Sequence, residues 1–308
     1  MAKDIVYVIG HKSPDTDTVC SAIAYAEYLK KKEKVNAIAA VCGELNPETN
    51  FVLKYFKVAK PKNLDSVARK ILVLVDHNEK NQMPDGTDMA KIIEVLDHHK
   101  INFECAEPIK FHTEPAGSTA TLVANLMLVN KFKITKPLAG ILLSAILSDT
   151  VVFKSTTTTP ADIAIAKKLA KIAKIPNLKK FGIEIKKQKA CLKGLIAEQI
   201  IYSDFKTFDT DDKKFGVGQI EVVDLAEAES RTAEILAKMN EIAQKDNLAF
   251  VALMITDIIN EGSLVLVAGD TSYFEKAFKK PYAPGGVYLE KMMSRKKDLL
   301  PPLLETLK

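Results

Sequence analysis

The sequence predicts an α/β protein: an N-terminal domain with a mostly parallel sheet flanked by helices, then a smaller C-terminal α/β domain with a mixed sheet. Apolar runs at residues 5–9, 35–41, 71–75 and 92–96 have the length and composition of buried strands. Helical patterns alternate with these runs, which is typical of βαβ units and a parallel sheet. A chain of 308 residues is long enough for two domains of ordinary size.

Five helices are expected in the N-terminal half, because apolar residues there recur at helical spacing or follow a helix-start signal. They cover residues 19–29, 51–56, 118–129, 139–147 and 160–169. The lysine-rich stretch 171–193 is expected to form a helix and a connector. We therefore place a linker at residues 189–195, between domains 1–188 and 196–308.

The smaller domain is expected to contain both kinds of element. Strands are predicted at residues 215–223, 250–255 and 264–268, and helices at 226–244 and 273–278. Asp211, Asp212 and Lys213 are typical of a hairpin turn between two strands. No internal repeat at a fixed period is present.

Composition narrows the functional class. The net charge of +5 is mild, and the chain has no Trp and only 7% aromatic residues, which argues against a base-stacking nucleic-acid platform. Lysine runs at 30–34 and 179–189 are interpreted as solvated faces. No apolar run has the length of a membrane span, and the N-terminus leaves no room for a signal peptide, so we expect a cytoplasmic protein. The four cysteines, without paired spacing, are interpreted as reduced packing residues: Cys20, Cys42, Cys105 and Cys191.

The first strand leads into a loop that is unusually rich in polar ligands. Gly10 and Pro14 break the chain, so His11, Asp15 and Asp17 lie between a strand and a helix. Either aspartate could serve only as the helix N-cap, since Asp is a preferred residue there. A cap requires one side chain, however, and two carboxylates with an imidazole exceed that requirement. Such a set suits a metal ion.

Two further strands end in the same kind of residue. The run 71–75 stops at Asp76, and the run 92–96 stops at Asp97-His98-His99. If the strands are parallel, all three clusters lie at one edge of the sheet, where open α/β sheets bind ligands. Asp149 ends an apolar helix, a position where the helix dipole disfavours negative charge, so it requires a cation or water.

Together these residues could hold two divalent metals about 3.5–4 Å apart, an arrangement that activates water for phosphoryl transfer. The candidate ligands are His11, Asp15, Asp17, Asp76, His98 and Asp149. Asp76 is our choice for a bridging ligand, because it directly follows a strand that looks central. Carboxylates and imidazoles without thiolates favour Mn²⁺, Co²⁺ or Mg²⁺ over structural Zn²⁺. His77 and Asp97 are interpreted as orienting or turn residues, and His112 as structural because it lacks a partner nearby in sequence.

The C-terminal domain offers cations. Arg295 and Lys296 lie within Ser294-Arg295-Lys296-Lys297, which by itself is more often a solvated basic cluster than a site. Arg provides a planar fork for phosphate oxygens and Lys a point charge. A metal-loaded acidic domain with a cationic one suits a small, highly charged phosphate substrate.

At this point the chain resembles a known family over essentially its whole length. The motifs that carry the resemblance are Gly10-His11-Lys12-Ser13-Pro14-Asp15-Thr16-Asp17, Val75-Asp76-His77-Asn78-Glu79, Asp97-His98-His99, Ser148-Asp149 and Ser294-Arg295-Lys296-Lys297. Together they are similar to family II inorganic pyrophosphatases of the DHH phosphoesterase superfamily. The first and third motifs are shared across the superfamily, whereas the second and fifth are specific to the pyrophosphatases.

The resemblance implies roles for these residues. His11, Asp15 and Asp76 would bind one Mn²⁺ or Co²⁺, and Asp17, Asp76, His98 and Asp149 a second. His99 would contact the substrate or assist proton transfer. Lys206, Arg295 and Lys296 would hold pyrophosphate from the C-terminal domain, accompanied by Mg²⁺; Lys206 rests on a looser match at residues 204–208. The resemblance also implies a homodimer through the N-terminal domain, with residues 1–188 as catalytic and 196–308 as substrate-binding domain.

The chain departs from the family pattern at two places. Lys100 stands where the family commonly has Arg, and Thr156 replaces the proline of a Lys-Ser-Pro turn. Neither residue is a proposed ligand. No nucleotide-binding regulatory insert is present between residues 60 and 120, so we expect no adenine-nucleotide control.

Three functional hypotheses follow. The first is hydrolysis of inorganic pyrophosphate to two phosphates by a hydroxide that two metals activate, in an active site between the domains, without nucleic-acid or membrane partners. The second is a DHH phosphodiesterase that cleaves short oligonucleotides or cyclic dinucleotides. Such enzymes usually carry a Gly-Gly-Gly-His-like motif, whereas residues 284–287 here are Pro-Gly-Gly-Val. The third is a metal- or phosphate-binding protein without activity, which a missing ligand would favour; none is missing.

Overall fold

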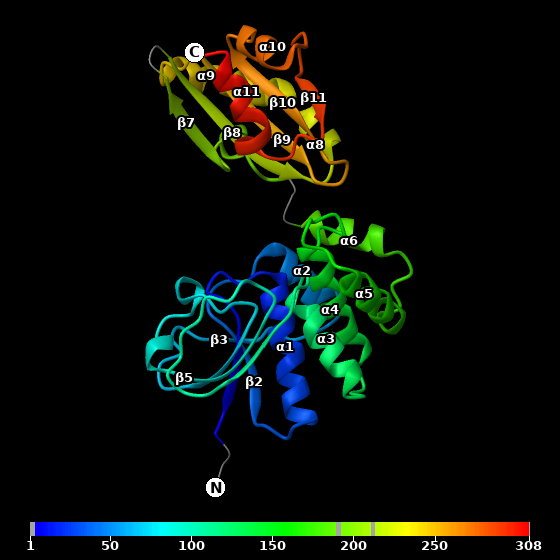
Figure 1. Cartoon of the computed structure of the whole chain (residues 1–308). Coiled ribbons are helices and arrows are strands. Elements are labelled where there is room, and N and C mark those ends of the chain that lie inside the picture. The colour runs from blue at the N-terminus through cyan, green and yellow to red at the C-terminus, as the bar shows by residue number, and fades with distance from the viewer. Residues whose placement is uncertain (1–3, 189–191, 211–212, 308) are drawn as a thin grey trace. The chain divides into compact units, whose positions relative to one another are not determined.

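The computed structural model describes residues 4–188, 192–210 and 213–307. The chain folds as two compact units, Met1–Lys189 and Ala190–Lys308, and each has its own apolar core (Figure 1). Within the described residues, no helix combines the length and the apolar character that a bilayer crossing requires.

The first unit is built on a parallel sheet, as predicted. Its described residues form six strands in the order β3-β2-β1-β4-β5-β6, every neighbouring pair being parallel. The strands are β1 (Val6–Ile9), β2 (Ala37–Val41), β3 (Lys62–Asn63), β4 (Ile71–Val75), β5 (Lys91–Asp97) and β6 (Lys110–Thr113). The sequence did not predict β3 and β6, because these short edge strands are not fully buried and lack a continuous apolar run.

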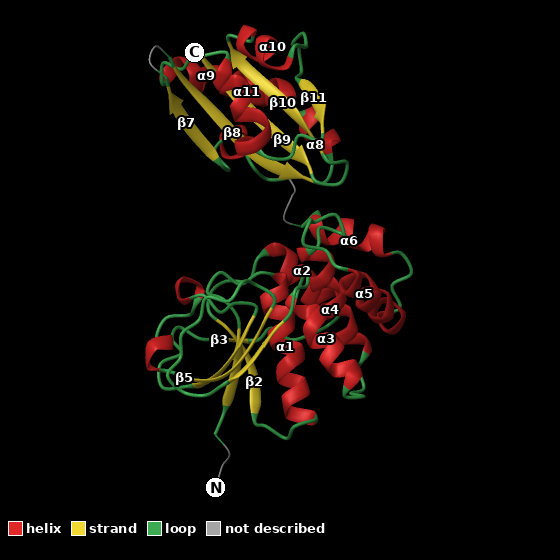
Figure 2. Cartoon of the chain, viewed as in Figure 1, coloured by secondary structure: helices red, strands yellow, loops and turns green. Residues whose placement is uncertain are grey.

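One face of this sheet packs against helices. They are α1 (Thr16–Lys31), α2 (Pro47–Tyr55), α3 (Thr119–Val129), α4 (Lys136–Asp149), α5 (Pro160–Ala173) and α6 (Leu178–Lys186). Figure 2 shows these helices gathered on one side of the strands. Side chains of β4 alternate accordingly: Val73 and Val75 join the helical core, whereas Leu72 and Leu74 pack on the opposite face.

Loops cover that opposite face. The connection from β4 to β5 contains the short helices η1 (Lys80–Gln82) and η2 (Thr87–Met89). The chain moves in one direction from β1 to β2 and in the other from β4 to β5. Because crossover connections are right-handed, reversal of direction moves the connection to the other face.

The second unit contains a mixed sheet, again as predicted. Its described strands are β7 (Phe205–Asp209), β8 (Lys214–Val222), β9 (Phe250–Asp257), β10 (Gly262–Gly269) and β11 (Val287–Glu290), in the order β11-β10-β9-β8-β7. Strands β8 and β9 are parallel and the other pairs antiparallel. The helices are α7 (Ala197–Ile201), α8 (Leu225–Ser230), α9 (Thr232–Lys245), α10 (Ser272–Phe278), η3 (Arg295–Leu299) and α11 (Leu300–Glu305). Two apolar clusters include β9 side chains of opposite parity, so both faces of the sheet are covered.

The single helix predicted at 226–244 is wrong. The structure has two helices, α8 and α9, separated at Arg231. The Arg231 guanidinium donates to the carbonyl of Leu192 at 3.2 Å and to Glu234 at 3.0 Å. Leu192 lies outside both helices, so the apolar periodicity of residues 226–244 did not reveal the break at Arg231.

The predicted hairpin turn lies partly outside the described residues, which exclude Asp211 and Asp212. At its margins, the Thr210 N–H donates to the Lys213 carbonyl at 2.8 Å, which closes the connection between β7 and β8.

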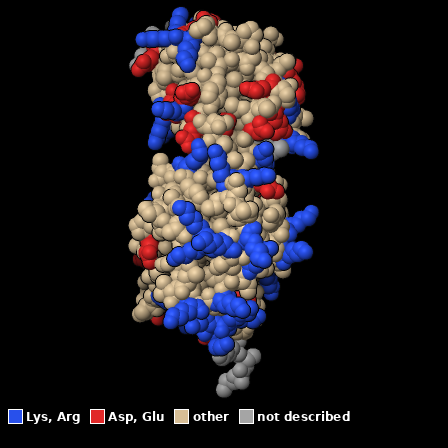
Figure 3. Space-filling model, turned by 90° about the vertical axis from the view of Figure 1, so that its right-hand side faces the viewer, with Lys and Arg blue, Asp and Glu red and all other residues tan. Residues whose placement is uncertain are grey.

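The cysteines and lysines only partly follow their predictions. Among the described residues, Cys20, Cys42 and Cys105 are free; Cys20 is buried, but Cys105 lies exposed in a loop, so its predicted packing role is wrong. Cys191 lies outside the described residues. Figure 3 shows Lys and Arg side chains protruding over much of one face. Within the run 179–189, however, Lys186 is largely buried, contrary to the prediction of a solvated face.

A buried carboxylate fastens two of the helices together. Asp162, which is fully buried, accepts from the N–H groups of Thr159 at 2.7 Å and Gly117 at 2.9 Å. The hydroxyl of Thr121 donates to it at 2.6 Å. It therefore caps α5 and holds the entry to α3.

We expect the substitution Asp162→Asn to lower the free energy of unfolding by roughly 1.5–3 kcal/mol. The carboxylate of Asp162 accepts hydrogen bonds with both oxygens, whereas the amide of asparagine would turn an N–H donor toward groups that are themselves donors. Urea unfolding of the full chain measures this change. Glu184→Gln, at an exposed position on α6, is the matched control. A change of less than about 0.5 kcal/mol for Asp162→Asn, the range of ordinary surface substitutions, would contradict the assignment.

Candidate functional site

The site lies where the strand order of the first unit reverses. Strands β1 and β4 are neighbours, but the chain leaves β1 toward β2 and leaves β4 toward β5. Loops that follow such strands diverge and leave a crevice at the carboxyl edge of the sheet, where α/β proteins bind ligands. His11 and Asp15 follow β1, and Asp76 follows β4. The edge predicted from sequence is therefore at this switch point.

The loop after β1 presents His11 and Asp15. The carboxylate of Asp15 accepts from the Thr18 N–H at 2.9 Å and caps α1. Its second oxygen lies 3.6 Å from His11 Nε2. One side chain thus caps the helix and also faces the imidazole.

Asp17 points toward a different helix. It is fully buried and accepts from the N–H groups of Thr119 at 2.6 Å and Ala120 at 2.9 Å, in the first turn of α3. Ser21 donates to it at 3.0 Å. Negative charge is favoured at a helix N-terminus, which explains how a buried carboxylate is tolerated here.

Asp76 occupies the centre of the site. Its backbone is left-handed, with φ of 64°, a conformation that asparagine and aspartate tolerate better than other non-glycine residues. Thr18 and Thr119 donate hydroxyl hydrogen bonds to its two oxygens at 2.7 and 2.9 Å. Those oxygens also lie 3.7 Å from His11 Nε2 and 3.5 Å from His98 Nε2.

Asp97 is the last residue of β5, and His98 and His99 follow it, next to Asp76. His98 Nδ1 lies 2.8 Å from the Ala116 carbonyl, which can only accept, so Nδ1 carries the proton. His99 Nδ1 contacts Asp97 at 2.8 Å. Asn78 donates to the other oxygen of Asp97 at 2.6 Å. The orienting role predicted for Asp97 matches this geometry, and Asn78 completes the support.

Asp149 ends α4 and faces the same cluster. Its carboxylate lies 3.9 Å from His98 Nε2. The three residues Val151, Val152 and Phe153 then have φ of 47°, 56° and 68°, so the chain makes a left-handed turn directly after it. Nothing in the sequence predicted this turn, because it contains no glycine.

The six candidate ligands come together in two groups whose ligand atoms lie within 4.8 Å of one another. The groups are His11, Asp15 and Asp76, and Asp17, Asp76, His98 and Asp149. Asp76 is common to both, as expected for the residue chosen as a bridge. A third group of the same kind joins Asp76, His98 and His99.

Crowded carboxylates perturb one another strongly. Burial and the charge of Asp76 raise the pKa of Asp17 to about 8. Burial, with the charges of Asp17 and Asp15, raises the pKa of Asp149 well above its usual range. Burial alone would lower the pKa of His98, but its contact with Asp76 raises that pKa to about 10. The two imidazoles thus offset only part of the negative charge, and the site favours further cations.

The cations predicted in the second unit differ in their surroundings. Arg295 is buried, and its Nη2 lies 3.0 Å from Asp204 while Nη1 also donates to the Asp204 carbonyl. Gln219 accepts from the Arg295 N–H at 3.2 Å. Lys206 on β7 and Lys296 in η3 are exposed. The interpretation of residues 294–297 as a solvated basic cluster is therefore wrong for Arg295. The sequence did not reveal its carboxylate partner, Asp204.

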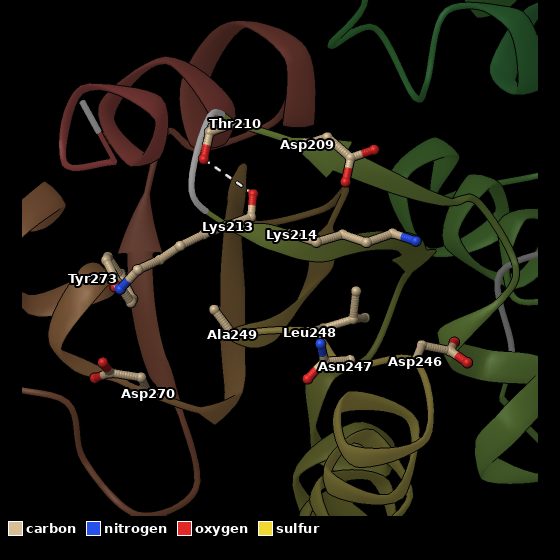
Figure 4. A pocket seen from close by; sticks show the side chains of 10 residues that line it. All are labelled: Asp209, Thr210, Lys213, Lys214, Asp246, Asn247, Leu248, Ala249, Asp270 and Tyr273. Carbon is tan, nitrogen blue, oxygen red and sulfur yellow. Dashed lines mark hydrogen bonds between the residues drawn. The ribbon is translucent and has the colours of Figure 1, made fainter.

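His112 and a surface cavity lie outside the candidate site. His112, on edge strand β6, has its Nε2 3.1 Å from Glu114, so the prediction that it lacks a nearby partner is wrong. The cavity, of about 750 Å³, lies in the second unit. Its lining residues include Asp209, Lys214 and Tyr273, as Figure 4 shows, and none is a predicted site residue.

Comparisons with known proteins agree with the motifs. Residues 5–146 match the DHH family N-terminal domain, and residues 183–306 match the DHHA2 domain. A manganese-dependent inorganic pyrophosphatase from Methanocaldococcus jannaschii is 46% identical over 305 residues, covering 96% of this chain and 97% of its own. Another from Bacillus subtilis is 39% identical over 306 residues, covering 98% of both chains.

The chain belongs to the manganese-dependent inorganic pyrophosphatases. A crystal structure described as a family II inorganic pyrophosphatase from Methanococcus jannaschii matches with a TM-score of 0.65 and 44% identity, over 98% of this chain and 99% of that one. The predicted resemblance and fold class are confirmed.

The residues of this pyrophosphatase fit a manganese centre. Mn²⁺ accepts oxygen and imidazole ligands, and both groups consist of these donors without a thiolate. Among the described residues, the buried His98 Nε2 has no hydrogen-bond partner. Because Nδ1 is held by the Ala116 carbonyl, Nε2 is the nitrogen directed toward the carboxylates of Asp76 and Asp149, and a metal ion bound there would displace its proton.

Mn²⁺ is expected to raise the unfolding temperature of the metal-stripped pyrophosphatase. At one hundred times the dissociation constant, binding to the folded state adds about 2.7 kcal/mol, or roughly 5–10 °C for a unit of this size. Differential scanning calorimetry of the full chain measures the shift. Asp76→Asn, which weakens both groups, is expected to abolish it, and an equal shift in that variant would place the metal elsewhere.

Proposed function

We propose that the protein hydrolyses inorganic pyrophosphate to two phosphates. The observation that carries this proposal is the pair of ligand groups that share Asp76, at the switch point of a sheet in a chain of the pyrophosphatase family. A shared carboxylate can hold two cations close together, as phosphoryl-transfer centres require.

In this proposal His11, Asp15 and Asp76 hold one Mn²⁺, and Asp17, Asp76, His98 and Asp149 hold the other, with Co²⁺ as an alternative and Mg²⁺ accompanying the substrate. When bound, two such ions lower the pKa of water so that it becomes a nucleophile, and they neutralise charge on the phosphoryl oxygens. The protein fixes the ligand directions: the helix dipole of α3 holds Asp17, and two threonine hydroxyls hold Asp76.

His99 is proposed to bind the substrate or assist proton transfer. Its contact with Asp97 raises the pKa of His99, while the pKa of the buried Asp97 lies below its usual range despite burial, because His99 and Asn78 bond to it. Nδ1 therefore faces a carboxylate, and Nε2 is left for a phosphate oxygen. The side chain is 51% exposed, which leaves it accessible.

Lys206, Arg295 and Lys296 are proposed to bind pyrophosphate. Cations beside the phosphoryl oxygens offset the charge that develops as the bridging bond breaks. Arg295 is preorganised by Asp204, whereas Lys206 and Lys296 present exposed amines. Family membership favours this substrate over the oligonucleotides and cyclic dinucleotides of the alternative hypothesis. A homodimer through the first unit and a cytoplasmic location stay predictions.

Purified, Mn²⁺-loaded protein is expected to release phosphate from pyrophosphate and to leave a dinucleotide intact. Asp76→Asn is expected to reduce phosphate release by more than about 100-fold, because it weakens both metal groups at once. A phosphate-release assay and chromatography of the dinucleotide, on one preparation, measure both reactions. Turnover of the dinucleotide alone would favour the phosphodiesterase, and unchanged activity of Asp76→Asn would refute its shared role.

Asp97→Asn is expected to lower kcat roughly 10- to 100-fold at saturating Mn²⁺, because an amide no longer fixes the proton on His99 Nδ1. Steady-state kinetics on pyrophosphate measure the change. Glu114→Gln is a matched control, since it alters a histidine–carboxylate pair of the same unit, His112 with Glu114, that contains no candidate ligand. Equal kcat values for the two variants would remove His99 from the proposed reaction.

A further inference from the structure

Lys186 differs from Lys179, Lys180 and Lys187, the other described lysines of the run 179–189, which are exposed. Its side chain is 15% exposed, and Nζ lies 3.6 Å from Glu48 Oε2. The amine also donates to the hydroxyl of Ser148 at 3.1 Å. A lysine directed inward gives up hydration, so the contacts that it makes must replace that hydration.

Glu48 receives several donors in the interior. Its side chain is 2% exposed and lies in the first turn of α2. Thr16 donates to Oε1 at 3.2 Å, and Ser148 donates to the same oxygen. We call Thr16, Glu48, Ser148 and Lys186 the Glu48 cluster. Its two charged members, Glu48 and Lys186, form a buried pair with no net charge. The pair therefore changes the electrostatic potential at the neighbouring carboxylates only a little.

The Glu48 cluster adjoins the candidate ligands without supplying any. Thr16 lies between Asp15 and Asp17 in sequence, and Ser148 directly precedes Asp149. No member of the cluster belongs to the ligand groups found among the described residues. The cluster therefore links the loop after β1 to the end of α4, and α6 supplies its cation.

Helix α6 also contacts the other side of Asp149. The left-handed turn after Asp149 places Val152 against Gly182 of α6, where a Cβ would lie 2.7 Å from Val152 Cγ2. Left-handed backbone is unfavourable for non-glycine residues, so the surrounding side chains must hold this turn. Lys186 and Gly182 thus contact both flanks of Asp149, one through Ser148 and the other through Val152.

We propose that α6 positions the metal centre: Lys186 and Glu48 hold the segments that carry Asp15, Asp17 and Asp149 at the separation that two metal ions require. The inference rests on the metal centre proposed above. Neither residue belongs to a candidate ligand group, so the role proposed for both is positioning. Partners of this kind typically change metal affinity by about 10- to 100-fold when removed.

Charge and position give opposite expectations for Lys186. If only its positive charge mattered, Lys186→Met would remove a repulsive charge near the metal centre and tighten Mn²⁺ binding. If Lys186 positions ligands, the same substitution loosens them and weakens binding. Glu48→Gln, which keeps the shape and the acceptor Oε1 but removes the charge, is expected to weaken binding on both grounds.

The test is a titration of the metal-stripped full chain with Mn²⁺. The EPR signal of free Mn²⁺ measures how much of the added metal remains unbound. We expect Lys186→Met and Glu48→Gln each to raise the dissociation constant by about 10-fold or more, and Lys186→Arg to restore it to within about threefold of wild type. Lys179→Met, an exposed lysine of the same helix, is expected to change it less than about twofold. Thermal unfolding of each metal-free variant shows whether it is folded. If Lys186→Met fails to fold, Ser148→Ala takes its place: it removes the hydroxyl that bonds to Glu48 and Lys186 without changing the net charge, and weaker Mn²⁺ binding is again the expected result.

The outcomes separate the two proposals. Unchanged or tighter binding by Lys186→Met, with wild type binding normally, overturns the positioning role and leaves the metal centre intact. If Lys179→Met weakens Mn²⁺ binding as much as Lys186→Met does, the positioning role is also overturned, because loss of any lysine from this helix then has the same effect. A wild-type chain that binds no Mn²⁺ overturns the metal centre and the inference together.

Discussion

The main constraint on the first unit is electrostatic. One edge of its sheet brings several carboxylates together, and the rest of the unit has to offset their mutual repulsion. Asp76 lies at their centre, near the imidazoles of His11 and His98 and grouped with three other carboxylates, those of Asp15, Asp17 and Asp149. The raised pKa values of Asp17 and Asp149 show how strongly burial and charge oppose full ionisation there. Such an arrangement is stable in a folded chain only if helix termini, hydroxyls and cations offset the repulsion.

The surrounding elements supply those compensations with different groups. Backbone N–H groups of α3 solvate Asp17, and threonine hydroxyls from α1 and α3 solvate Asp76. Farther away, Glu48 and Lys186 add hydrogen bonds without adding net charge. Support of this kind restricts the direction of each carboxylate, which a centre for two closely spaced ions requires.

The cations of the predicted site belong to the second unit. Its buried Arg295 is paired with the exposed Asp204, whereas Lys206 and Lys296 lie exposed on different elements. A paired guanidinium keeps a fixed direction, and exposed amines adapt to a ligand at an entropic cost. In the proposed reaction, the first unit supplies ligands for metals and the second supplies charge for phosphate.

The sequence by itself determined the fold class, the sheet edge that carries the acids, and the family, because strand periodicity and contiguous motifs are local properties of the chain. It also singled out Asp76 before any geometry was known. Only the tertiary structure showed that Asp15 rather than Asp17 caps α1, that α8 and α9 are separate, and that Lys186 points inward to Glu48. These features depend on contacts between residues far apart in sequence, such as Asp17 with Thr119 and Glu48 with Ser148, whose energies leave no periodic pattern in the chain.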